Sequence, residues 1–259
     1  MKKLSCLLLA LSLISLPGML HAQKSREFYQ LTVYHFSNGE QEKVIDNYLK
    51  NAYVPAIHRN GIKNVGVFKL IANDTAVDKR IYVLVPVKKF DALLNVSSKL
   101  LKDKEYLQNG KEYLDAPFSN TPYLRLENIF LQAFELAPTM KLPKLNSAKT
   151  ERVFELRSYE SGTEKLYRNK VEMFNQGGEI KLFERLNFNA IFYAEVLSGP
   201  RMPNLMYMTS FENREDRDAH WKTFGSDPEW KRLSALPQYQ KNVSKSDILL
   251  LHATDYSDY

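Results

Sequence analysis

An internal repeat constrains the fold of this chain more than any other feature of its sequence. The segment 29–34 (YQLTVY) aligns with the segment 154–159 (FELRSY), so that aromatic, polar, leucine and tyrosine positions coincide. At the same offset Asn64 falls on Asn189 and Tyr82 on Tyr207, and one deletion later 105–107 falls on 229–231. Chance rarely produces agreement in register over such a length, so we infer two copies of one structural unit.

Each copy is predicted to contain the same six elements. Residues 27–36 alternate in polarity as a strand does, whereas residues 40–60 carry the spacing of a helix. The other elements of the first copy are strands 64–72 and 80–86, helix 89–108 and strand 124–134; those of the second are strand 152–159, helix 163–186, strands 189–197 and 204–211, helix 213–233 and strand 246–253. The sequence therefore predicts an α+β fold of two ferredoxin-like βαββαβ units.

The last helix of the second copy contains its own start and stop signals. Asn213 is a candidate N-cap, and Gly225 to Glu229 is expected to stop the helix and restart it, with Asp227 as cap and Pro228 in the first turn. Trp221, Trp230 and Phe224 are interpreted as anchors that pack this helix on the sheet; the alternative is a recognition surface at the break.

The N-terminus resembles a cleaved export signal. Lys2 and Lys3 precede an apolar run at 7–16, which is too short to span a bilayer, and Ala22 marks a plausible cleavage point. The sequence thus predicts a periplasmic or secreted protein. Cys6 is the only cysteine and lies within this segment, so the mature chain would hold no thiol, disulfide or cysteine metal site.

The domain boundaries follow from the repeat and from a proline-bearing tether. We assign residues 1–22 to the signal peptide, 23–136 to the first ferredoxin-like domain, 137–150 to a linker and 151–259 to the second domain. The linker is short enough for the two copies to touch.

Composition and motifs exclude several functions. The net charge of +6 is spread over scattered lysines and arginines, without the basic and aromatic stripe of a nucleic-acid surface. No segment after residue 22 is apolar for long enough to cross a membrane. Phosphate-binding, dinucleotide-binding and serine-hydrolase glycine motifs are absent, and no cofactor is expected.

Three segments resemble the NIPSNAP family. Residues 152–159 (RVFELRSY) are similar to its opening strand, and residues 218–230 (DAHWKTFGSDPEW) are similar to the signature in its second helix. Residues 48–61 resemble the first helix of bacterial members, although the first copy is the more degenerate. The resemblance implies a dimeric α/β barrel, in which two ferredoxin-like sheets pack face to face, here within one chain. It implies no particular activity, because the family has no settled one.

Candidate ligand-binding residues come from strand alternation. Phe154, Leu156 and Ser158 share one face of the fifth strand and are expected to meet the helices. The opposite face, together with its counterparts in the first copy, is expected to point into the space between the sheets; these residues are Glu155, Arg157, Tyr159, Gln30, Thr32 and Tyr34. They form either a pocket for a polar ligand or an internal ion pair that closes the barrel and binds nothing.

The histidines do not indicate a metal or haem site. His35 has the parity of Leu31 and Val33 and is placed with the helix-facing set. His58, His220 and His252 belong to no close-spaced metal-binding pattern and are interpreted as surface or packing residues.

Two functions remain open at this stage. One is a binding module for a small molecule or a protein partner. The other is a cofactor-free monooxygenase- or isomerase-type enzyme with its pocket between the two sheets. A homodimer is compatible with either, because edge strands of such sheets can pair between chains.

Overall fold

A computed structural model describes residues 25–259, so the predicted signal peptide at 1–22 lies outside the described residues. The first half contains β1 (Phe28–Phe36), α1 (Gly39–Tyr48), a π-helical turn (Leu49–Tyr53), α2 (Val54–Arg59), β2 (Gly66–Leu70), a 3₁₀ turn (Ile71–Asp74), β3 (Lys79–Val87), α3 (Phe90–Leu100), α4 (Lys104–Asn109), α5 (Lys111–Leu114) and β4 (Arg125–Ala133).

The second half repeats this order. It contains β5 (Val153–Glu160), α6 (Glu164–Phe174), α7 (Glu179–Arg185), β6 (Ala190–Ser198), β7 (Asn204–Phe211), α8 (Arg214–Ser226), α9 (Pro228–Ser234), a 3₁₀ turn (Pro237–Tyr239) and β8 (Lys245–Ala253). The tandem repeat is thereby confirmed.

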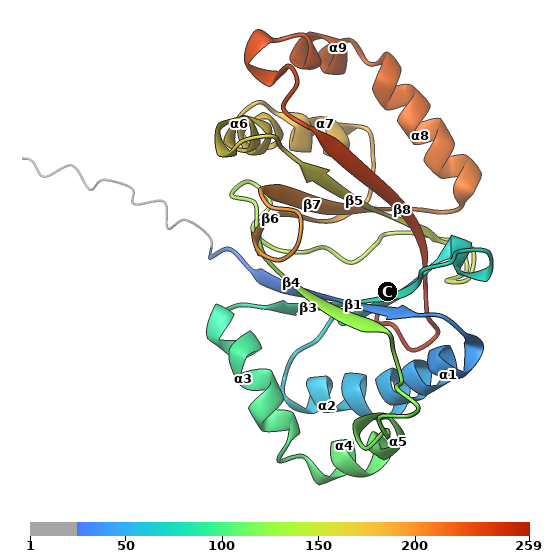
Figure 1. The fold of residues 1–259 in the computed structure, drawn as a ribbon. Coiled ribbons are helices and arrows are strands. Elements are labelled where there is room, and N and C mark those ends of the chain that lie inside the picture. Colours follow the sequence, from blue (N-terminus) through green and yellow to red (C-terminus); the bar gives the residue numbers. More distant parts are fainter. Residues whose placement is uncertain (1–24) are drawn as a thin grey trace, which may run out of the picture.

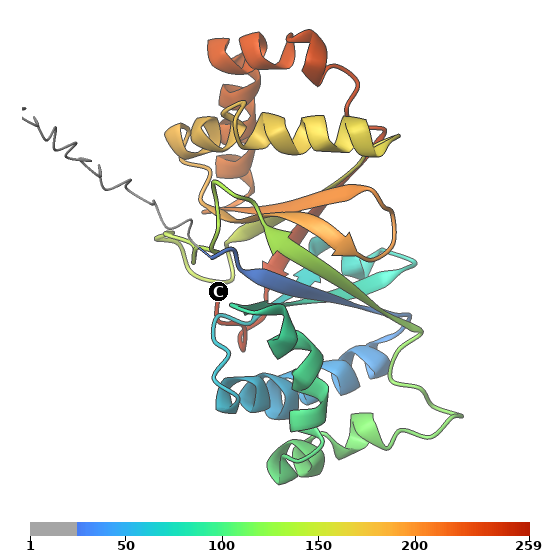
Figure 2. The same ribbon diagram turned by 90° about the vertical axis from the view of Figure 1, so that its left-hand side faces the viewer.

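The eight strands close into one antiparallel barrel in the order β1-β3-β2-β8-β5-β7-β6-β4. Within each half the strands follow the ferredoxin-like order, and the halves are joined where β2 pairs with β8 and β4 pairs with β6. The helices of the first half cover one side of this barrel and those of the second half cover the other (Figures 1 and 2). The predicted fold class is confirmed.

The molecule has a hydrophobic cluster inside the barrel and another beneath each helical layer. The inner cluster joins both halves: the ring of Phe68 lies 4.9 Å from that of Phe154, and the ring of Tyr29 lies 5.3 Å from that of Phe192. The tail after β8 crosses to the first half, where Tyr259 is buried against Phe68 inside the barrel. The interior is therefore filled at its centre and at this end.

The predicted assignment of strand faces is wrong. Phe154 and Leu156 point into the barrel, while Glu155 and Arg157 point outward beneath α8. Likewise Gln30, Thr32, Tyr34 and Tyr159 lie on the outward face, and His35 faces the barrel with Leu31 and Val33. The physical reason is that a closed barrel excludes water and takes apolar side chains, whereas the outer face has polar partners: α8 for Glu155, and Asn128 of β4 for Gln30 and Thr32.

The predicted start and restart of the last helix are confirmed, whereas the break within the predicted helix 163–186 was not predicted. The Asn213 side chain caps α8, and the Asp227 side chain accepts from two backbone N–H groups at the start of α9. The predicted helix 163–186 is broken between α6 and α7, where Gly178 has φ +96°, a conformation that strongly favours glycine. Within the described residues, no helix is long and apolar enough to cross a membrane.

Candidate functional site

Three of the predicted site residues form a buried polar cluster beneath α8. The Glu155 carboxylate is fully buried and accepts from the Arg157 guanidinium, from Arg217 Nε at 2.5 Å and from Trp221 Nε1 at 3.0 Å. The Arg157 guanidinium also lies 3.6 Å from the centre of a Trp221 ring, a close cation–π contact. The two segments of the second half that carry the family resemblance thus meet at this cluster.

The cluster continues through two tyrosines into the helix-facing core. Arg157 donates to the Tyr159 hydroxyl at 2.9 Å, and the hydroxyls of Tyr159 and Tyr207 are 2.9 Å apart. Burial alone would lower the pKa of Arg157, but Tyr207, Tyr159 and Glu155 together raise it above its ordinary value. Each charge is therefore satisfied within the protein, and the cluster fixes α8 on the sheet.

The corresponding residues of the first half lie apart from this cluster. Gln30 Nε2 donates to Thr32 and to Asn128, whereas Tyr34 packs edge to face against Tyr113 in the helix-facing core. The structure does not bring the six predicted residues together, and they do not line a space between the sheets.

The pocket that does lie between the sheets opens at one mouth of the barrel. It has a volume of about 210 Å³ and is lined by both halves of the chain. Its polar residues are His35, Arg80, Tyr82, Arg125, Glu127, Ser158, Arg201, Asn204 and Asp247. Polar side chains collect here because the barrel interior meets solvent at its mouth.

His35 lines this pocket, which we call the mouth pocket. Strand register places Arg80 of β3 and Arg125 of β4 directly beside it on either side. His35 Nδ1 lies 2.8 Å from Asp78 Oδ1, and since a carboxylate only accepts, Nδ1 carries the proton. In this tautomer His35 Nε2 is the acceptor, and Arg125 Nη2 donates to it at 3.3 Å.

Asp78 connects His35 to Arg80. Arg80 Nε and Nη2 both donate to Asp78 Oδ2, at 2.8 and 2.6 Å, so that the two oxygens of one carboxylate hold the imidazole and the guanidinium. Partial burial would raise the pKa of Asp78, but the hydrogen bonds from Arg80 and His35 hold it below its usual value. Asp78 therefore stays ionised and fixes the tautomer of His35.

A buried hydroxyl supplies a further donor. Arg80 Nη1 donates to the Tyr82 hydroxyl at 3.4 Å, and within residues 25–259 this hydroxyl has no other hydrogen-bond partner. Burial raises the pKa of Tyr82, and the hydrogen bond from Arg80 only partly opposes this. The hydroxyl thus keeps its proton, which among the described residues has no acceptor and is available to a molecule in the pocket.

The rim of the mouth pocket carries two more arginines, each beside a carboxylate. Arg125 Nη2 lies 2.8 Å from Glu127 Oε1, and Arg201 pairs with Asp247. Arg201 has φ +67°, a left-handed conformation that is costly for a side chain of this kind. This strained residue lies in the loop between β6 and β7, and its guanidinium lines the pocket.

Sequence reasoning did not single out Arg80, Tyr82, Arg125 or Arg201. One signal was present: Arg80 and Tyr82 are two residues apart in one strand and therefore share one face, and Asp78 continues this spacing just before the strand begins. Their link to His35, however, depends on the register between β1 and β3, which no local pattern contains.

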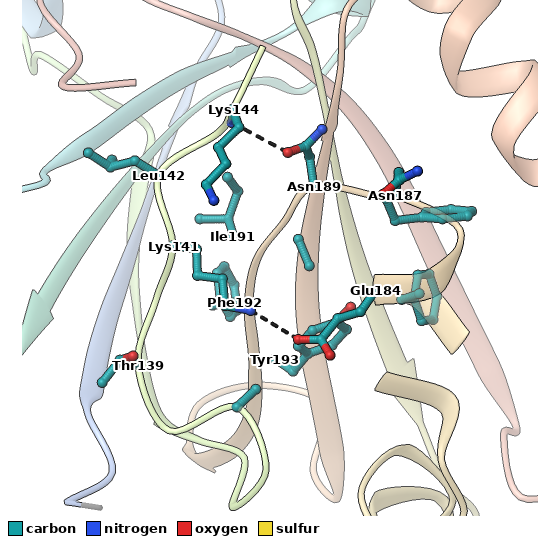
Figure 3. A pocket seen from close by; sticks show the side chains of 14 residues that line it. Thr139, Lys141, Leu142, Lys144, Glu184, Asn187, Asn189, Ile191, Phe192 and Tyr193 are labelled. Atoms are coloured by element: carbon teal, nitrogen blue, oxygen red, sulfur yellow. Dashed lines mark hydrogen bonds and ion pairs between the residues drawn. The ribbon is translucent and has the colours of Figure 1, made fainter. Parts of the chain in front are cut away.

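A second pocket lies outside the barrel, between the linker and the start of β6. This linker groove has a volume of about 320 Å³; Figure 3 shows Lys141 and Lys144 on one side and Glu184 and Asn189 on the other. Lys141 Nζ pairs with Glu184 Oε1 at 3.0 Å, but both side chains are more than half exposed, and such pairs contribute little. The mouth pocket has more charged and hydrogen-bonding side chains facing one cavity than the linker groove, so we take it as the candidate site.

Among the described residues, no group of three or more His, Cys, Asp or Glu side chains could hold a metal ion. The three described histidines outside the mouth pocket have local partners. His58 lies 2.9 Å from Asp258, while the Nδ1 atoms of His220 and His252 each lie 2.8 Å from a backbone carbonyl oxygen.

The closed eight-stranded barrel with two helical layers defines a tandem dimeric α/β-barrel protein. The chain is similar to a "putative monooxygenase" of Lactobacillus acidophilus NCFM, with TM-score 0.57 and 12% identity over 88% of this chain and 94% of that one. A protein of the same description from Fusobacterium nucleatum gives TM-score 0.52 and 9% identity over 89% and 93%. An anthrone oxidase-like protein gives TM-score 0.53 and 5% identity over 90% and 93%. At these identities the likeness establishes the fold alone.

Residues 154–258 match the NIPSNAP family. The match to this family thus lies in the second half, as the two signature segments indicated. Among curated proteins, no sequence matches the chain.

Proposed function

We propose that this chain is a binding protein for a small organic anion, seated in the mouth pocket between the two sheets. The observation that carries the proposal is the convergence of Arg80, Arg125 and Arg201 on one cavity, beside the Tyr82 hydroxyl, which within residues 25–259 donates to no protein atom. An anionic oxygen in the pocket could accept from this hydroxyl and from the guanidinium groups together.

The charges around the pocket favour a monoanion over a polyanion. Each guanidinium has five N–H donors, so that Arg80 retains Nη1 for a ligand after donating twice to Asp78. At the rim, however, Glu127 and Asp247 already neutralise much of the positive charge. Asp78 balances Arg80 in the same way, so the three pairs are formally neutral. A single carboxylate on a small carbon skeleton would therefore bind through the N–H donors that these pairs leave free, and it fits a volume of about 210 Å³.

Export belongs to the same proposal. The basic start, short apolar run and small residue at Ala22 support a signal peptide, so the ligand would be met in the periplasm or outside the cell.

A second candidate function is that of a cofactor-free enzyme. It is favoured by the pairing of His35 with Asp78 at the pocket.

The test is isothermal titration calorimetry of the protein with acetate, benzoate, 2-oxobutanoate and phosphate. We expect at least one carboxylate to bind, and Arg125→Gln to weaken it about 10-fold or more, because a charged hydrogen bond contributes roughly 1.5–3 kcal/mol. Arg168→Gln, an exposed arginine on α6, is the matched control and should bind like the wild type.

Two outcomes would overturn the proposal. One is that none of the four anions binds. The other is that binding survives Arg125→Gln but is lost in Lys144→Gln, which would move the ligand to the linker groove.

A further inference from the structure

We propose that His35 accepts a proton from carbon in the mouth pocket, so that the protein catalyses proton exchange or isomerisation of a small 2-oxo acid. This inference rests on the proposed anion-binding function and names its substrate class. It follows from three groups of different chemistry that face one cavity: a carboxylate-backed imidazole, a donor pair formed by Arg80 and Tyr82, and the rim arginines.

The imidazole is prepared as a base by its neighbours. Asp78 Oδ1 accepts the Nδ1 proton at 2.8 Å, which directs the lone pair on Nε2 towards the pocket and would stabilise the imidazolium formed after proton transfer. Asp78 is itself held by two hydrogen bonds from Arg80. The pairing therefore has a fixed geometry before any ligand arrives.

Access to Nε2 is controlled by a charged side chain at the rim. Arg125 Nη2 covers Nε2 at 3.3 Å, and Glu127 Oε1 lies 3.6 Å from the same atom. The Arg125 side chain is 61% exposed, so it can turn to pair with a ligand carboxylate. Binding of the carboxylate would thus uncover the base beside the bound molecule.

The donor pair supplies the electrophilic side of the reaction. Arg80 Nη1 and the Tyr82 hydroxyl lie deeper in the pocket than the rim arginines, because Tyr82 is buried in the barrel interior. A carbonyl oxygen placed there would accept from both. Such donors stabilise the negative charge that develops on a carbonyl oxygen when a neighbouring C–H bond breaks.

The substrate class follows from these positions. A 2-oxo acid has a carboxylate for the rim, a carbonyl for the donor pair and an acidic C–H next to that carbonyl for His35. The C–H bond breaks, an N–H bond forms at Nε2, and the electron pair moves to the carbonyl oxygen to give an enolate. The imidazolium then returns a proton to the same carbon or to another one, and no oxidant is consumed.

The experiment follows deuterium incorporation into 2-oxobutanoate in D₂O by proton NMR, with binding measured separately by calorimetry. We expect the C3 proton signal to decay faster with protein than in buffer. His35→Gln should abolish this acceleration while changing the affinity only a few-fold. Asp78→Asn should slow exchange about 100-fold at unchanged fold, since this side chain is 43% exposed.

The matched control is His220→Gln on α8, whose imidazole also pairs with an aspartate, Asp216, but lies away from the pocket. It should exchange at the wild-type rate. Binding of 2-oxobutanoate without exchange, or exchange that survives both His35→Gln and Asp78→Asn, would overturn proton transfer and leave anion binding intact. If 2-oxobutanoate does not bind but another anion does, this inference alone fails; if no anion binds, both fail.

Discussion

At the scale of single residues, Glu155 explains why the family-like strand segment 152–159 carries charged residues in a buried place. Its carboxylate accepts from Arg157 on its own strand and from Arg217 and Trp221 on α8. A fully buried carboxylate is costly unless it is paired and hydrogen-bonded, and here it has three donors. The strand and helix segments are thus matched to each other by charge.

Replacing this carboxylate should therefore weaken the fold. Glu155→Gln is expected to lower the free energy of unfolding by about 3 kcal/mol, because it leaves the buried Arg157 guanidinium without its counterion and removes one of the two counterions of Arg217. The measurement is denaturant unfolding followed by tryptophan fluorescence. Glu151→Gln, the same change at an exposed turn before β5, should alter stability by less than about 0.5 kcal/mol. Equal effects would contradict the structural role of Glu155.

At the scale of elements, the helices of the second half are set by local capping. Asn213 Oδ1 accepts from the Asp216 N–H at 2.9 Å to begin α8, and Asp227 begins α9. The bend between α8 and α9 allows Phe224 and Trp230 to pack 4.5 Å apart by ring centres. Local hydrogen bonds thus position the aromatic anchors of the helical layer.

Removal of the first cap should have a moderate, local effect. Asn213→Ala is expected to lower the free energy of unfolding by about 1 kcal/mol, since one helix N–H loses its acceptor. Thr223→Ala is a suitable control because its hydroxyl only donates to Ala219 O on the exposed side of the same helix. Urea denaturation of both variants checks the difference; a cap variant as stable as the wild type would refute the prediction.

At the scale of the whole molecule, the barrel interior is one core shared by both halves. Phe68 of the first half contacts Phe154 of the second, and four of the eight strands, β2, β8, β4 and β6, form the joints. Each half alone would expose this apolar face to water, so the two halves should unfold together.

Tryptophan fluorescence reports unfolding of the second half alone, because both tryptophans, Trp221 and Trp230, lie there. It can therefore show whether a substitution in the first half destabilises the second. Phe68→Ala, in the first half, should cost about 3–5 kcal/mol and shift the tryptophan fluorescence transition as far as the circular dichroism transition. Phe118→Ala, a fully exposed phenylalanine of the first half, should leave both unchanged. Two separate transitions in Phe68→Ala would show that the halves unfold independently.

Local patterns in the sequence predict the order of the elements, the duplication and the cap at Asp227, because strand alternation, helical spacing and capping act over a few residues. It could not decide which face of β1 and β5 points inward, because in this architecture both faces are buried and alternation only separates them. The mouth pocket also depended on tertiary structure. His35 meets Arg80 and Arg125 only through pairing between strands that are distant in the chain, and that pairing is set by closure of the barrel.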